Sequence, residues 1–142
     1  MNKNISSEVR NIMNDRFQKD SLIALATTDG DTPYVRAVNS YYEDGSFYVI
    51  TYALSGKMEQ IAVNPTVAIC GDWFTAHGVG ENLGWMLDEN NADIANKLRT
   101  AFASWYNNGH TNEADPNTVI LRIRLTDGVL LHHGTRFDID FT

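Results

Sequence analysis

Apolar residues at helical spacing open the chain. Ile5, Val9, Ile12, Met13 and Phe17 follow one another with polar residues between them. This spacing places all five side chains on one face of an α-helix. We therefore expect an amphipathic N-terminal helix that covers an apolar surface.

From residue 21 the pattern changes to that of β-strands. Three runs are rich in apolar and β-branched residues, and they cover residues 22–28, 34–42 and 47–52. Asp29-Gly30 separates the first two runs and Asp44-Gly45 separates the second two, and both pairs are typical of tight turns. The sequence therefore predicts a three-stranded antiparallel meander.

The third run leads directly into a short helix. Ser55, Gly56 and Lys57 open it, and Asn64-Pro65 ends it. The free backbone N–H groups at a helix N-terminus and the helix dipole favour an anion, Gly56 allows close approach, and Lys57 adds a positive charge. The alternative interpretation is that Ser55 is simply the N-cap of a surface helix.

The second half of the chain continues with strands around one longer helix. Its expected elements are a fourth strand at 66–76, an irregular fifth strand at 79–87, a helix at 91–108, a strand at 118–125, a turn at Asp127-Gly128 and a last strand at 129–133. We interpret the whole chain, residues 1–142, as a single mainly β (α+β) domain. Antiparallel strands in this number, with helices inserted as caps, predict a closed or split barrel.

Composition limits the range of functions. Eleven basic against 18 acidic residues give a net charge of −7, which argues against general nucleic-acid binding. The N-terminus lacks the apolar core of a signal peptide, and no apolar run approaches the length of a membrane span. We expect a cytoplasmic protein that does not associate with membranes.

Cysteine and histidine offer little support for a metal site. Cys70, the single cysteine, lies in an apolar run and is expected to be a small core residue. His132 and His133 are adjacent on an expected strand, so we expect them to point to opposite faces. No ligand spacing of a zinc site is present, and we expect no metal.

Arg36 lies in the middle of the second expected strand. An arginine in a half-buried strand needs a partner, which is either one of the carboxylates or a bound anion. If the turn at residues 43–45 is a simple hairpin, Arg36 comes within reach of the strand that ends at Thr51. Arg36, Thr51, Ser55 and Lys57 can then converge on one phosphate.

Several of these features recur in order in a known family. They are Val35-Arg36-x-Val38, an Asp-Gly turn, a strand ending at Thr51, Ser55-Gly56-Lys57-x-x-Gln60-Ile61 and Asn64-Pro65. With them the chain resembles the pyridoxamine 5′-phosphate oxidase-like, FMN-binding split-barrel family. The resemblance covers residues 8–88 well and the later strands loosely.

The resemblance implies a six-stranded antiparallel split barrel that forms a homodimer with FMN in clefts at its interface. It assigns the FMN phosphate to Arg36, Ser55 and Lys57, and the isoalloxazine to the backbone around residues 38–40 and to the end of the next strand. The cofactor-binding positions that it implies in this chain are Arg36, Val38, Asn39, Ser40, Ile50, Thr51, Ser55, Gly56, Lys57 and Gln60.

Other parts of the chain depart from the family. In the family a glutamine of the partner subunit contacts FMN, and its position here falls near Val79. The family oxidase also has a C-terminal segment rich in Arg and His that binds a substrate phosphate. Here only Arg136 could supply some of that charge, which is weak support. We therefore do not expect a pyridoxal phosphate synthase. No catalytic residue is identified; His77 is a weak candidate for a general acid or base, and the alternative is a hydrogen-bonded structural residue.

Trp73 and Trp85 are the aromatic residues that we expect at the dimer interface, because they lie on strands that the family uses for dimerisation.

Three functions remain open. The first is an FMN-dependent oxidoreductase that acts on a small molecule and an electron donor, where the flavin supplies the chemistry. The second is a dimeric module that binds FMN, haem or a related cofactor without turnover, with His77, His132 or His133 as an axial ligand of haem. The third is a structural dimer with an empty cleft.

Overall fold

The computed structural model describes residues 5–142. The first helix, α1 (Ser7–Phe17), precedes three strands, β1 (Ser21–Thr28), β2 (Pro33–Glu43) and β3 (Ser46–Tyr52). A short helix, α2 (Gly56–Val63), follows β3. This half of the chain confirms the expected order of helix, meander and helix, because its Asp-Gly turns and helix boundaries are strong local signals.

The second half contains four strands and one longer helix. Its elements are β4 (Thr66–Gly71), β5 (Phe74–Trp85), the 3₁₀ turn η1 (Glu89–Asn91), α3 (Ala92–Ala101), β6 (Thr118–His132) and β7 (Thr135–Asp140). The strands form one antiparallel sheet in the order β3-β2-β1-β4-β5-β6-β7, and β3 also pairs with β6. Strands β1 to β6 therefore close into the expected six-stranded barrel, and β7 extends it along the second half of β6.

Several strand boundaries in the second half differ from the predicted ones. The expected fourth strand is two strands, because the chain reverses at Asp72-Trp73, where Trp73 has a φ of 51°. Asp127-Gly128 is not a turn but continues β6, and the turn falls at His133-Gly134. A Cβ on Gly128 would lie 3.0 Å from the Phe74 ring, so this glycine serves aromatic packing.

The third helix is shorter than predicted. Regular helix ends at Ala101, although Phe102 and Trp105 still belong to the same apolar cluster. The predicted apolar stripe is therefore confirmed, but residues 102–117 form turns and bends instead of helix.

The prediction that Cys70 lies in the core is also wrong. Cys70 is exposed, because the alternation of β4 points Val67 and Ile69 inward and Cys70 outward.

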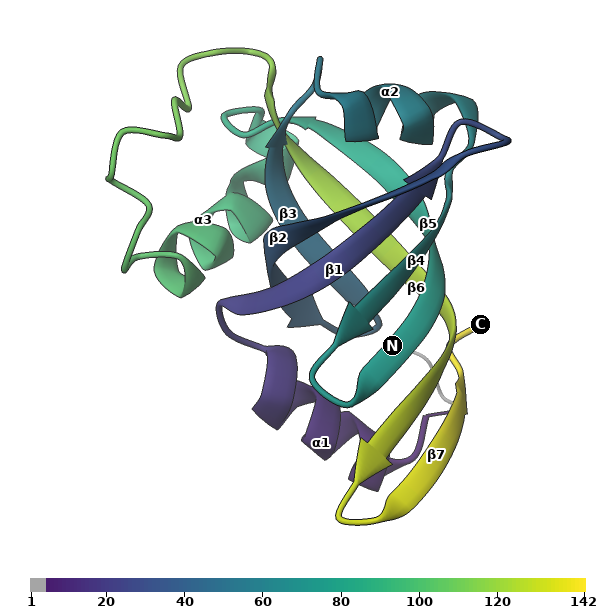
Figure 1. The fold of residues 1–142 in the computed structure, drawn as a ribbon. Coiled ribbons are helices and arrows are strands. Elements are labelled where there is room, and N and C mark those ends of the chain that lie inside the picture. Colours follow the sequence, from purple (N-terminus) through teal and green to yellow (C-terminus); the bar gives the residue numbers. More distant parts are fainter. Residues whose placement is uncertain (1–4) are drawn as a thin grey trace.

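The core fills the barrel, and helices cover its ends and one side (Figure 1). Helix α1 covers one end, where Phe17 contacts Phe47 and Phe74 at ring-centroid distances of 5.4 and 5.6 Å. Helix α2 lies at the opposite end. A second apolar cluster packs α3 against the outside of β3 and β6 through Leu98, Phe102 and Ile120, among others.

Candidate functional site

The barrel is split between β2 and β3. These strands pair only at Tyr41–Tyr48, Tyr42–Phe47 and Glu43–Ser46. Beyond these pairs, residues 33–40 of β2 bond only to β1, and residues 49–52 of β3 bond only to β6. The two strands therefore diverge and leave facing backbone edges that can bind a ligand.

Helix α2 stands at the open end of this split because tight packing fixes it there. Met58 and Ile61 form its buried face. A Cβ on Gly80 of β5 would lie 2.9 Å from Ile61 Cγ2, so the glycine allows the helix to approach the sheet closely. The N-terminus of α2 consequently follows directly from the free end of β3.

Arg36 points toward the interior from β2 and joins a polar cluster. Its guanidinium donates to Thr27 Oγ1 at 2.7 Å, to the carbonyl oxygen of Leu25 at 3.2 Å and to Gln60 Oε1 at 3.4 Å. The hydroxyl of Thr27 in turn donates to Gln60 Oε1. Sequence reasoning missed Thr27, although a polar residue on the inward face of an otherwise apolar strand was a readable signal.

Lys57 lies next to this cluster and donates to Thr51 Oγ1 at 2.8 Å. Burial, and then the positive charge of Arg36, lower the pKa of Lys57, and burial lowers the pKa of Arg36. Within residues 5–142, no carboxylate forms an ion pair with either cation. Arg36 therefore does not pair with a carboxylate of the described residues, which was one of the two partners expected for it. Instead, two partly buried cations lie close together without a counterion from residues 5–142.

Ser55 adds a third group that lacks a partner. Ser55 is the N-cap residue of α2, yet its side chain makes no capping hydrogen bond. Its Oγ is fully buried and, among the described residues, is the one buried side-chain polar atom without a hydrogen-bond partner. Since a buried hydroxyl without a partner costs about 1–3 kcal/mol, an incoming acceptor or donor at this point would stabilise the protein.

The remaining predicted cofactor residues lie along the same split but expose different groups. The side chains of Val38 and Ser40 are buried, and Ser40 Oγ donates to the carbonyl oxygen of Ser21 at 2.8 Å. Asn39 points outward and donates to Asp20 at 3.1 Å. Ile50 packs against the α3 cluster, and Gly56 is exposed at the first turn of α2. At residues 38–40 only the backbone faces the split.

His77 is not brought together with Arg36 and Lys57. It lies on the outer face of β5, and its Nδ1 is 2.9 Å from Asp127 Oδ1, with both side chains 64% exposed. The alternation of β2 puts Arg36 on the inner side of the sheet. Within one chain, His77 therefore has the arrangement of a hydrogen-bonded surface residue.

The two adjacent histidines differ from expectation. His133 has a φ of 48° in the β6–β7 turn, and its ring centroid lies 4.1 Å from that of His132. Their rings are therefore in contact and do not point to opposite faces. Arg16 Nη2 lies 3.1 Å from His132 Nδ1. Across residues 5–142, no three His, Cys, Asp or Glu side chains are grouped as they would be around a metal ion.

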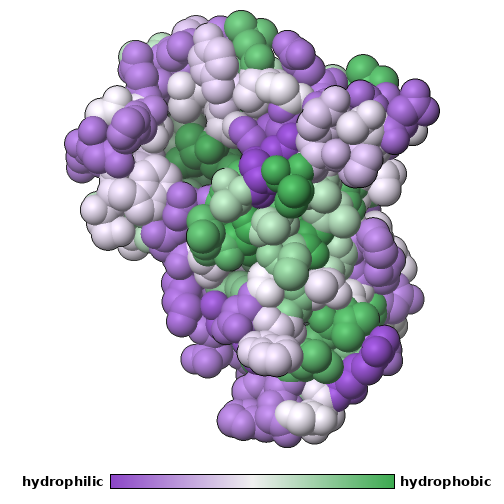
Figure 2. Space-filling model, viewed as in Figure 1, coloured by the Kyte–Doolittle hydropathy of each residue, from purple (hydrophilic) through white to green (hydrophobic). Residues whose placement is uncertain are grey.

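An apolar surface covers the outside of the sheet beside the split. Leu22 is 66% exposed on β1 and Val35 is 70% exposed on β2. Ala24, Ala26 and Ala68 lie in the same region at neighbouring register positions. Figure 2 shows hydrophobic residues gathered over the middle of this face. We call this area the outer apolar face.

The two tryptophans expected at an interface are placed differently. Trp73 is 68% exposed in the turn between β4 and β5. Trp85 packs within the α3 cluster, and its Nε1 donates to the carbonyl oxygen of Glu113 at 2.8 Å. Only Trp73 is therefore free to contact another molecule.

Two cavities of similar volume lie away from the Arg36–Lys57 cluster. One of about 560 Å³ is lined by Arg16, Trp73 and the β6–β7 turn, and one of about 580 Å³ lies between the end of α1 and α3. The cluster itself lies at an open split, so this chain would leave one side of a ligand held there uncovered.

No helix within residues 5–142 is both long and apolar enough to cross a membrane.

Comparison with known proteins agrees with this geometry. A family profile described as pyridoxamine 5′-phosphate oxidase matches residues 11–132, and the chain belongs to this family. A search of curated proteins found no match.

Solved structures share the fold at low sequence identity. General stress protein 26 from Bacillus anthracis is 19% identical, with a TM-score of 0.68, and the match covers 93% of this chain and 99% of that one. A protein from Mesorhizobium loti described as FAD-binding is 16% identical, with a TM-score of 0.63 and coverage of 87% and 92%. A haem-binding protein from Mycobacterium smegmatis is 14% identical, with a TM-score of 0.64 and coverage of 87% and 54%.

Proposed function

We propose that the chain binds FMN and holds its phosphate at the N-terminus of α2. The observation that carries this proposal is the group of Arg36, Lys57 and Ser55: residues 5–142 supply no counterion for the two cations and no partner for the buried hydroxyl. All three groups are suited to a phosphate, which is dianionic and offers several acceptor oxygens. Family membership supports a flavin as the molecule that carries this phosphate.

Each residue of the cluster has a separate task in this proposal. Lys57 and Arg36 supply charge, and Ser55 supplies a hydroxyl at the helix N-terminus. Thr27 and Gln60 hold the Arg36 guanidinium in place through the bonds described above. Thr51 positions the ammonium of Lys57. The free backbone edges of β2 and β3 offer N–H and C=O groups to the rest of the cofactor.

We further propose that two copies of the chain associate through the outer apolar face. This face exposes Leu22 and Val35 next to the split, and water contact with such a surface is unfavourable. A second copy would bury it and could cover the side of the split that one chain leaves open. Sedimentation should give twice the chain mass, and Val35→Glu should shift the protein toward the monomer. A wild-type monomer at micromolar concentration would contradict this part.

As a reaction, we propose two-electron transfer between a reduced donor and a small molecule. Bound flavin supplies this chemistry. The protein contributes anchoring and orientation, and the cluster of Arg36, Lys57, Ser55, Thr27, Gln60 and Thr51 contains no histidine or carboxylate. A cytoplasmic location goes with this proposal and is tested by cell fractionation.

A cofactor-binding module without turnover is the second candidate. Its support is the structural similarity to a protein described as haem-binding. For haem, His132 is a poor ligand in the observed arrangement. Arg16 Nη2 lies 3.1 Å from its Nδ1, so a guanidinium already occupies the space in front of this nitrogen.

The visible absorption spectrum of protein purified without added cofactor separates these candidates. Flavin bands support the first proposal, and a Soret band supports haem. A colourless preparation that also fails to retain FMN after loading would contradict flavin binding. If FMN is retained, oxidation of NADH or NADPH above the rate of free FMN favours an enzyme.

A further inference from the structure

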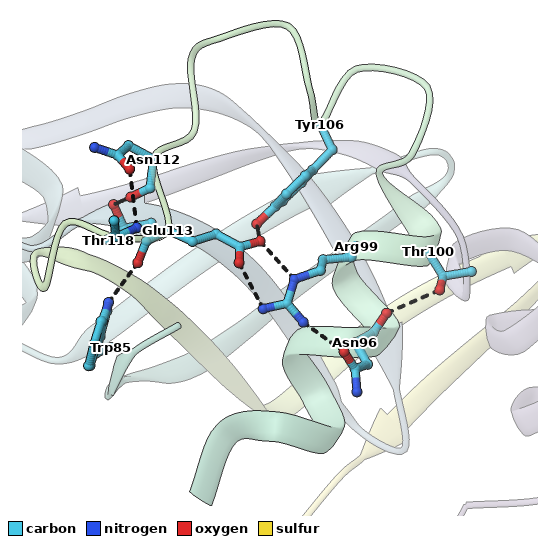
Figure 3. Close-up of polar contacts among 9 residues, drawn as sticks. Trp85, Asn96, Arg99, Thr100, Tyr106, Asn112, Glu113 and Thr118 are labelled. Atoms are coloured by element: carbon cyan, nitrogen blue, oxygen red, sulfur yellow. Dashed lines mark hydrogen bonds and ion pairs between the residues drawn. The ribbon is translucent and has the colours of Figure 1, made fainter. Parts of the chain in front are cut away.

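The segment 102–117 connects α3 to β6 and contains no helix or strand. Glu113 anchors it: one carboxylate accepts bonds from Arg99 Nε at 2.7 Å and Arg99 Nη2 at 3.0 Å, and the Tyr106 hydroxyl also donates to it. The carbonyl oxygen of Glu113 accepts from Trp85 Nε1. Figure 3 shows these bonds: Arg99 of α3 and Tyr106, near the start of the segment, both reach the carboxylate of Glu113. We call the last part of the segment, residues 112–117, the return limb.

Two further bonds fix the return limb beside the end of β3. Thr118 Oγ1 donates to the carbonyl oxygen of Asn112 at 2.6 Å, and the backbone N–H of Ala53 donates to the carbonyl oxygen of Asn117 at 2.7 Å. Residues 110 and 111, which precede this limb, are therefore held close to the strand end. They are not an unattached loop.

A small cavity lies between these residues and β3. It has a volume of about 140 Å³, and its lining residues are Ile50, Thr51, Tyr52, His110, Thr111 and Thr118. A cavity of about 150 Å³ in another protein accommodates one benzene molecule, so this space admits a single ring. Thr51 also accepts the bond from Lys57, so the cavity adjoins the anion cluster.

The lining defines the chemistry of such a ring. None of the six lining residues is Lys, Arg, Asp or Glu, so the walls of the cavity carry no full charge of their own. His110 and Thr111 provide hydrogen-bonding groups on one side, and Ile50 and the exposed ring of Tyr52 provide apolar contact on the other. A neutral ring with a polar substituent matches both sides.

We propose that this cavity binds a single neutral ring bearing a hydrogen-bonding substituent, and that His110 determines its specificity by bonding to that substituent. Its role as the substrate pocket of the flavin reaction rests on the proposed function. The binding of the ring itself does not. The cavity would thus select against two-ring molecules.

Phenol is the probe that tests the proposal, followed by two-dimensional NMR of the labelled protein. We expect saturable shifts at the amides of residues 50–52 and 110–111. His110→Ala should weaken phenol binding about two- to tenfold, the worth of one hydrogen bond. His133→Ala, which changes an exposed histidine in the distant β6–β7 turn, should leave the affinity unchanged. 1-Naphthol should not shift the residues of this cavity.

Four outcomes would overturn the proposal: no saturable phenol shifts, shifts confined to other regions, equal affinity in wild type and His110→Ala, or comparable shifts of these residues with 1-naphthol. A parallel FMN titration by fluorescence reports on the binding of the flavin. A protein that binds phenol here but not FMN would refute the proposed function and retain the ring site. The opposite result would refute only the ring site.

Discussion

Lys57 offers a direct way to separate ligand binding from fold stability. In the ligand-free protein its ammonium is half-buried, lies near the positive Arg36 and has one neutral partner, Thr51. Lys57→Met keeps the length and apolar contacts of the side chain and removes only its charge. The variant should therefore fold at least as well as the wild type but bind FMN more weakly.

The magnitude follows from the contact that is lost. A hydrogen bond to a charged group contributes about 1.5–3 kcal/mol, and each 1.4 kcal/mol is a factor of ten. The Kd for FMN should rise about 10- to 150-fold. The free energy of unfolding of the ligand-free variant should stay within about 0.5 kcal/mol of the wild type or exceed it, because one neutral hydrogen bond is exchanged for relief of desolvation and repulsion.

Fluorescence titration with FMN and with riboflavin is the assay. Riboflavin lacks the phosphate, so its affinity should not change in Lys57→Met. Lys97→Met is the matched control, since Lys97 lies on α3 and already pairs with Glu43 and Asp93. This control should bind FMN as the wild type does.

Two results would refute the assignment. One is an FMN affinity of Lys57→Met within about twofold of the wild type, well below the expected loss. The other is an equal loss of FMN and riboflavin affinity, which would mean that the substitution disturbs the site generally. A large loss of stability in the ligand-free variant would contradict the view that Lys57 lacks a counterion.

Three further predictions concern stability and its link to the site. Ser55→Ala should not lower the unfolding free energy of the ligand-free protein and should raise it by up to about 1–3 kcal/mol, because it removes a buried hydroxyl for which the described residues supply no partner. Ser6→Ala, whose hydroxyl accepts from a backbone N–H at 3.2 Å, should lower it by about 1 kcal/mol in urea denaturation. Equal losses in the two variants would contradict the unpaired state of Ser55. Gly80→Ala should cost about 1–3 kcal/mol and weaken FMN binding, because its Cβ would meet Ile61 at 2.9 Å and displace α2; unchanged FMN affinity would show that α2 tolerates the shift. Glu113→Gln should cost about 1–2 kcal/mol, since it weakens a partly exposed ion pair with α3.

The ion pair of Glu113 also gives a pH dependence. Its hydrogen bond with Arg99 is the largest of the effects that lower the pKa of Glu113 below 4.5. A group whose pKa is lowered by folding stabilises the protein above its unfolded pKa, and this contribution is lost as the pH falls through the folded value. The difference in unfolding free energy between wild type and Glu113→Gln should therefore shrink below about pH 4.5. A difference that does not change with pH there would contradict the ion pair.

Local signals predicted the first half of the fold better than the second. Two Asp-Gly turns and the Ser55 and Pro65 boundaries lie within a few residues of the elements they define, so they could be read from the sequence. Asp127-Gly128 has the same composition as those turns. Its actual role depends on Phe74, which is far away along the chain and packs against Gly128 only in the closed barrel. Packing between residues so far apart in the sequence cannot be recognised from the residues around Gly128 alone.

The candidate site, too, could be predicted only in part. A hairpin between the second and third strands was enough to predict that Arg36 and Lys57 approach each other. The lack of a carboxylate beside them and the buried, unpaired hydroxyl of Ser55 required the folded structure. The cavity beside His110 was not predicted, because residues 102–108 were expected to continue the third helix.

The central claim is that the N-terminus of α2 is a phosphate site. Its most direct test is to compare the Kd values of FMN and riboflavin for the wild-type protein under identical conditions. The two ligands differ only in the phosphate, so the account predicts that FMN binds about 100-fold more tightly or better, as two or more charge-assisted hydrogen bonds require. Equal affinity for the two flavins, or no affinity for either, would contradict it.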